Sequence, residues 1–152
     1  MEELRTAADD FVLGRIDSSR LPVVAAWALA RGVDSPSLRE LAGLGRSEPR
    51  ESADLFSSAM AELGHPLRPS TVVAWDRARR AARALLAGER AAPDVAGEIA
   101  ALLVPDGPVD LAARFEMVAV LWDETPSHRG KLVSDAEAAA KTLLAWDSAP
   151  ST

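Results

Sequence analysis

The chain has 152 residues, a formal net charge of −6, and a composition that is 48% hydrophobic and 26% charged. Its length is that of one ordinary domain, and its composition is that of a globular protein. Because cysteine is absent, disulfides, thiolate zinc sites and a cysteine nucleophile are excluded. The acidic start lacks a signal-peptide pattern, and the longest apolar run, Leu21 to Ala30, is shorter than the roughly 20 residues of a membrane helix. We therefore expect a cytoplasmic protein without membrane contact.

Thirty alanines and few β-branched or aromatic clusters predict an all-α fold. Serine, proline and glycine mark where the helices begin and end. We expect eight helices. The first four run from about 2 to 13, from Pro22 to before Gly32, from the cap Ser35 to Gly43 or Gly45, and from Ser47 to Gly64. The fifth runs from Ser70 to Gly88, the sixth from Pro93 onward, the seventh follows the turn 105–108 with a stripe of Leu111, Phe115, Val118 and Trp122, and the eighth runs from 133 to 146. Residues 148–152 are expected to form a disordered tail.

An internal repeat is suggested by two pairs of similar segments. The segment "ALARGVDSPSLRELAGL" (28–44) aligns with "ALLAGERAAPDVAGEIAAL" (84–102), and Pro49, Ala53 and Phe56 have the spacing of Pro108, Ala112 and Phe115. The repeat predicts one domain over 1–147 with a period of about 56–59 residues, in which three-helix units stack on each other. The units would cover about 21–64 and 70–124, and the capping helices about 2–13 and 133–146. Chance similarity between alanine-leucine helices is the alternative.

The three-helix plan resembles armadillo and HEAT repeats, whose usual period of about 40–47 residues is shorter. The segments "DSPSLRELAGL" and "ADLFSSAMAELG" are also similar to small uncharacterised helical proteins of bacteria. These resemblances imply an all-helical, stacked architecture, and no functional residue is carried over from them.

The segment "SPSLRELAGLGRSEPRESADLF" (35–56) has the helix, glycine turn and second helix of a helix-turn-helix. The second helix, however, is expected to present four carboxylates outward, with Arg50 as the opposing charge: Glu48, Glu51, Asp54 and Glu62. A recognition helix needs basic groups for phosphates and Arg, Asn or Gln for base edges. We therefore interpret this segment as a joint between repeat helices, and we do not expect it to bind DNA.

The predicted fifth helix carries a stripe of four arginines, which are Arg77, Arg79, Arg80 and Arg83. Side chains three or four residues apart lie on one side of a helix, so the stripe could bind an anion or nucleic acid. A solvated face balanced by neighbouring acids is the alternative. Only Trp75 stands near the stripe to stack on bases, which disfavours nucleic-acid binding.

Motifs for catalysis or cofactor binding are absent from the sequence. It contains no G-x-S-x-G turn, no phosphate-binding glycine loop and no H-E-x-x-H metal motif. The two histidines, His65 and His128, are expected in solvated loops. Tryptophan precedes aspartate at residues 75, 122 and 146, and we interpret these tryptophans as core anchors near helix ends. We expect no catalytic group, no cofactor and no metal.

The remaining hypothesis is that this chain is a non-catalytic module that binds another protein. In particular, the chain would itself be the acidic partner of a basic protein, as an immunity protein or antitoxin is. The residues expected to contact the partner are Glu51, Asp54, Ser58, Asp110 and Arg114. One alternative is a small-molecule binder or enzyme with its site in the groove between repeat units, near Trp75, Arg79 and His128. A second alternative is nucleic-acid binding through the arginine stripe. Homodimerisation through an alanine-rich face is also left open.

Overall fold

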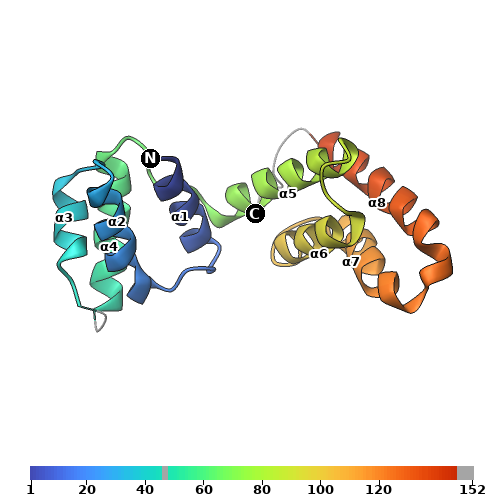
Figure 1. Cartoon of the computed structure of the whole chain (residues 1–152), viewed down its shortest axis with the longest axis horizontal. Coiled ribbons are helices and arrows are strands. Elements are labelled where there is room, and N and C mark those ends of the chain that lie inside the picture. The colour runs from blue at the N-terminus through green and yellow to red at the C-terminus, as the bar shows by residue number, and fades with distance from the viewer. Residues whose placement is uncertain (46–47, 147–152) are drawn as a thin grey trace. The chain divides into compact units, whose positions relative to one another are not determined.

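The computed structural model describes residues 1–45 and 48–146, and all regular structure in this part of the chain is helical (Figure 1). The predicted all-α class is therefore confirmed. The eight described α-helices are α1 (Glu2–Val12), α2 (Leu21–Ala30), α3 (Pro36–Ala42), α4 (Pro49–Glu62), α5 (Ser70–Leu86), α6 (Ala92–Leu103), α7 (Val109–Glu124) and α8 (Arg129–Leu144), with 3₁₀ turns η1 (Ser18–Arg20) and η2 (Pro126–His128). Ser47, the expected start of the fourth helix, and the expected tail 148–152 lie outside the described residues.

Two compact units make up the chain, Met1–Ser70 with α1 to α4 and Thr71–Thr152 with α5 to α8. In the first unit, α3 packs against both α2 and α4, and Figure 1 shows α2 between α1 and α3. In the second unit, α7 packs against both α6 and α8. The duplication, the two three-helix units within one domain, and the capping role of the first and last helices stay predictions.

The first unit is built around Phe56 of α4, which is fully buried. The ring of Phe11 from α1 meets the Phe56 ring edge-on, with 5.6 Å between ring centroids, an arrangement that aromatic pairs favour. Leucines and alanines of the other helices close around this pair. The buried apolar residues of the unit are Leu4, Ala8, Leu21, Ala25, Ala28, Leu38, Leu41, Phe56, Ala59 and Met60.

The start of α3 is fixed by two hydrogen-bonding groups. The hydroxyl of Ser35, the predicted cap, accepts a hydrogen bond of 3.2 Å from the Leu38 amide. The Glu62 carboxylate, in the last turn of α4, accepts hydrogen bonds from the Ser37 amide at 3.1 Å and the Ser37 hydroxyl at 2.6 Å. Since the amides that begin a helix have no partner within it, Glu62 completes the cap from a neighbouring helix.

These hydrogen bonds hold the pKa of Glu62 below its ordinary value of 4.5, with the Ser37 hydroxyl as the largest cause, followed by the Ser37 amide and the Ser35 hydroxyl. A carboxyl whose pKa is lower in the folded state adds stability above its unfolded pKa, and this stability is lost as the pH falls through the folded pKa. We therefore expect Glu62→Gln to lower the free energy of unfolding at pH 7. The difference from the wild type should narrow once the pH falls well below 4.5. Urea unfolding of the wild type and of Glu62→Gln at a series of pH values measures this difference and how it changes with pH.

Glu40→Gln is the matched control, because Glu40 is exposed on the same short helix, α3. It should change the free energy of unfolding by no more than about 0.5 kcal/mol. A Glu62→Gln deficit that stays constant from pH 7 to pH 3 would mean that Glu62 does not act through its charge.

The second unit has its core between α6, α7 and α8, and Phe115 of α7 is fully buried there. Between α6 and α7 the chain turns sharply at Gly107, whose amide donates a hydrogen bond of 2.6 Å to the Leu103 carbonyl. A β-carbon at residue 107 would lie 2.7 Å from that oxygen, so the turn requires glycine. Arg129 joins α7 to α8, because its guanidinium donates to the Trp122 carbonyl at 3.0 Å and lies 5.2 Å from the centroid of the Trp122 ring.

The tryptophans expected to be core anchors differ in exposure. Trp75 is buried and meets Trp146 edge-on, with centroids 6.0 Å apart. Trp122 is half-buried, and Trp146 is 41% exposed. The core interpretation thus holds for Trp75 and is wrong for Trp146.

Candidate functional site

Helix α2 is apolar on every side, yet only part of its surface is covered. Leu21, Ala25 and Ala28 are buried in the first unit. On the other side Trp27 is 64% exposed and Val23 is 41% exposed. Because Val23 and Trp27 are four residues apart, they adjoin on one side of the helix, and a contiguous exposed apolar patch marks a candidate contact surface.

A pocket of about 410 Å³ lies beside Trp27, between α1 and α2. Its apolar lining comes from both helices and from the residues that follow each of them. We call it the α1–α2 groove, and its lining residues are Met1, Glu3, Leu4, Thr6, Ala7, Asp10, Ile16, Arg20, Val24, Trp27, Ala28, Arg31 and Val33. The lining thus combines an apolar floor with two carboxylates and two guanidinium groups.

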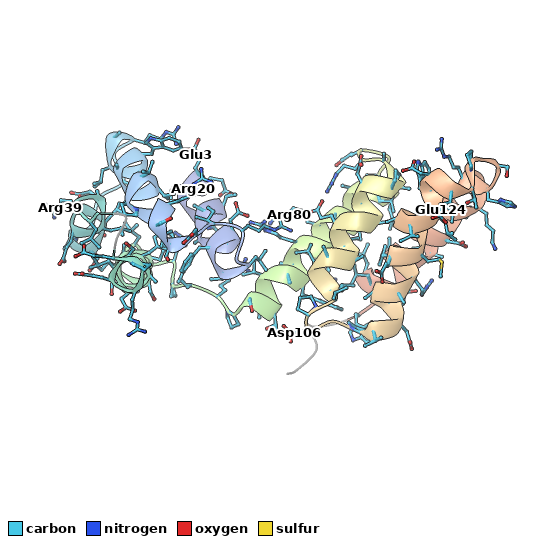
Figure 2. All side chains as sticks on the ribbon, turned by 90° about the horizontal axis from the view of Figure 1, so that it is seen from below. Glu3, Arg20, Arg39, Arg80, Asp106 and Glu124 are labelled. Carbon is cyan, nitrogen blue, oxygen red and sulfur yellow. The ribbon has the colours of Figure 1, made fainter. Side chains whose placement is uncertain are left out.

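The charged groups stand at the two ends of the groove. Glu3 of α1 forms an ion pair with Arg31, which directly follows α2. Because this pair joins the start of one helix to the end of the other, α1 and α2 run antiparallel, and Asp10 and Arg20 lie toward the other end. Glu3 and Arg20 are labelled in Figure 2. Arg20 is exposed and forms no ion pair within the described part of the chain, so its charge is available to a ligand.

The residues predicted to contact a partner are all exposed, but they fall into two sets. Glu51, Asp54 and Ser58 lie on α4 in the first unit. Asp110 and Arg114 lie on α7 in the second unit, and Arg114 donates to the Thr142 hydroxyl at 3.3 Å. The first set forms an acidic side of α4, because residues three and four apart share a side of a helix. The two sets belong to different units.

The predicted arginine stripe does not stay together as one face of α5. Arg79 turns toward the end of α8, where its guanidinium donates to the carbonyls of Trp146 and, at 3.3 Å, of Leu144. The last carbonyls of a helix have no partner within it, and Leu144 is the last residue of α8, with Trp146 two residues further on, so Arg79 acts as a helix C-terminal cap. Arg80 and Arg83 remain exposed, and Arg77 is half-buried.

The three residues named for a ligand site, Trp75, Arg79 and His128, are not brought together. Trp75 and Arg79 both contact the last residues described after α8, near Trp146. His128 directly precedes α8, whose 16 residues span about 24 Å at 1.5 Å per residue. A single small ligand cannot reach from one end of this helix to the other.

Within residues 1–45 and 48–146, no group of three or more His, Asp or Glu side chains is arranged to hold a metal ion. In the same part of the chain, no helix has both the length and the apolarity needed to cross a membrane.

Trp27 is the residue that the sequence prediction missed. The run Leu21 to Ala30 is apolar throughout, and the useful signal is that its apolar residues have no helical period. A helix that packs on one side needs only one apolar stripe, so an apolar helix in a small domain leaves a stripe uncovered unless a second layer lies over it.

Comparison of the chain with protein-family models, with curated proteins and with solved structures finds no match to any of them.

Proposed function

We propose that the protein is a non-catalytic protein-binding module, and that its α1–α2 groove receives apolar side chains from a partner. The observation that carries this proposal is Trp27, which is 64% exposed beside a pocket of about 410 Å³. Tryptophan and arginine are the residue types that most often dominate binding energy in protein interfaces. The groove brings Trp27 together with Arg20 and Arg31 around an apolar floor.

The shape of the groove favours a helical segment of the partner. The groove follows α2, whose ten residues extend about 15 Å, the length of about three helical turns. Helices bind in such grooves through apolar side chains spaced three and four residues apart. An acidic residue at one end of the partner helix would pair with Arg20.

The charge of the protein supports a partner that is basic over the rest of its surface. The chain has a net charge of −6, and Glu51 and Asp54 of α4 are exposed. Long-range attraction of this kind raises the rate of association more than it raises the affinity. Neutralisation of a basic protein, as by an immunity protein or antitoxin, is the biological role that fits this combination.

The experiment is parallel affinity capture from the native lysate with three baits: wild type, Trp27→Ala and Val104→Ala. Val104 is the matched control, because it is also 64% exposed but lies in the second unit. We expect one partner in stoichiometric amount on the wild-type and Val104→Ala baits, and its loss on Trp27→Ala. A partner that all three baits retain equally would reject the groove as its binding site.

The volume of the groove also favours a second candidate, a small-molecule binding site. Ligand pockets usually measure about 300–1,000 Å³ and combine apolar walls with a few polar groups. An amphiphilic anion would place its apolar part against Trp27 and its charge at Arg20. A ligand screen read by tryptophan fluorescence should then give signals with the wild type that vanish in Trp27→Phe. If no compound gives such a difference, this second candidate is withdrawn.

A further inference from the structure

We propose that the outer side of α7 and its border with α8 bind a second copy of the chain in a two-fold symmetric pair. This surface, which we call the α7–α8 face, consists of Val109, Ala113, Arg114, Met117 and Val120 of α7 and Asp135 and Ala138 of α8. It lies in the second unit, so the inference is independent of the α1–α2 groove.

Helix α7 carries apolar residues on two opposite sides. One side, with Phe115 and Val118, is buried in the core of the unit. On the opposite side Val109 is 80% exposed, Met117 is 57% exposed and Val120 is 55% exposed. With 3.6 residues per turn, these exposed residues form one stripe about half a turn away from Phe115. Three large apolar side chains in one exposed stripe are typical of a surface that another molecule covers.

A shallow groove of about 330 Å³ adjoins the stripe, between α7 and α8. Ala113, Met117, Val118, Leu132 and Ala138 form its apolar part, and Arg114 and Asp135 are its charged members. Small residues on both helices leave room for a long side chain from outside. Methionine is suited to this role, because its unbranched thioether adapts to irregular gaps.

The two charged residues of the face lie on either side of Met117. Helices α7 and α8 run antiparallel, because Arg129 at the start of α8 contacts Trp122 near the end of α7, while Arg114 contacts Thr142. Asp135 precedes Thr142 by seven residues, which is about 10 Å along α8. Arg114 therefore lies toward the start of α7, and Asp135 lies beside the part of α7 that follows Met117.

This arrangement is complementary to itself. A two-fold axis that crosses α7 near Met117 brings Arg114 of one copy onto Asp135 of the second copy, and the symmetry forms the same pair again on the other side. Met117 lies close to this axis, so it then meets Met117 of the second copy at the edge of both grooves. Within one chain Asp135 has no hydrogen bond or ion pair to any described residue, so it is available for this contact.

The test uses two charge reversals, Arg114→Asp and Asp135→Arg, and their equimolar mixture. By light scattering or sedimentation, we expect the wild type to reach twice the monomer mass of 16.1 kDa as its concentration rises. In a symmetric pair of either single variant, both contacts between residues 114 and 135 join charges of the same sign. Each variant alone should therefore remain a monomer. In the mixture, both pairs are opposite in charge again, and a heterodimer should form.

The control is Arg80→Asp, a charge reversal at an exposed residue of α5 in the same unit, which should dimerise like the wild type. Circular dichroism at increasing temperature checks that each reversal variant is folded. A wild type that stays monomeric at about 1 mM, where even a contact with a Kd near 1 mM is half formed, overturns the proposal. Single variants that still dimerise, or a mixture that stays monomeric, overturn the Arg114–Asp135 pairing. If a partner other than a second copy occupies the face, the wild type alone stays monomeric.

Discussion

Replacing Phe56 by alanine should lower the free energy of unfolding by about 3–5 kcal/mol, the range found when a fully buried phenylalanine is removed from a core. Phe56 is 0% exposed, and its ring contacts the ring of Phe11. The substitution removes the largest side chain from the core of the first unit and leaves a cavity between α1 and α4. Chemical unfolding followed by circular dichroism measures the loss.

Val23→Ala is the control for Phe56→Ala, because Val23 is also apolar and in the first unit but is 41% exposed. It should change the free energy of unfolding by no more than about 0.5 kcal/mol. Equal losses for the two variants would show that Phe56 is not the centre of the core described above.

Replacing Trp27 by alanine should raise the Kd for the partner about 30-fold, which corresponds to about 2 kcal/mol, the loss typical of an interface hot spot. The loss should appear in the dissociation rate, because Trp27 contributes contact area in the bound complex. The stability of the protein should hardly change, since Trp27 is 64% exposed. Surface plasmon resonance with the captured partner measures the association rate and the dissociation rate.

The double variant Glu51→Lys with Asp54→Lys provides the contrast. It should slow association and weaken its dependence on salt, and it should leave the dissociation rate and the melting temperature almost unchanged. An unchanged association rate would show that the acidic side of α4 does not attract the partner. An unchanged dissociation rate for Trp27→Ala would show that the α1–α2 groove does not hold the partner.

Local signals in the sequence predicted most of the helix boundaries. Ser35 was expected to cap α3, and its hydroxyl does accept the Leu38 amide. Four glycines expected at or near helix ends adopt positive φ values, a conformation that glycine reaches without strain: Gly14, Gly32, Gly64 and Gly88. These features depend on residues adjacent in sequence, which explains why they were predictable.

The start of α8 was predicted too late. The sequence predicts a start near residue 133, whereas the helix begins at Arg129. No serine, threonine or aspartate caps this end. Instead, the turn Pro126–His128 leads directly into the helix, and Arg129 is held by the Trp122 carbonyl of α7. A helix start that depends on a contact with another helix leaves no mark in the local sequence.

The candidate site depends on which sides of the helices other helices cover. The apolar run of α2 could be read from the sequence, but the exposure of Trp27 follows from the packing of α1 and α3 around that helix. The same holds for Arg79, which was predicted to join an arginine stripe and instead donates to carbonyls at the end of α8. Helical periodicity gives the direction of a side chain about its own helix axis, and tertiary packing decides what it meets.

The most direct test of the proposed function is hydrogen exchange of the protein, alone and saturated with the captured partner, followed by mass spectrometry. We expect the partner to slow exchange in peptides covering residues 2–12 and 20–33, which contain most of the lining of the α1–α2 groove. Peptides covering α7 and α8 should exchange equally in both states. Slower exchange confined to residues outside the α1–α2 groove would contradict the claim that this groove is the partner-binding surface.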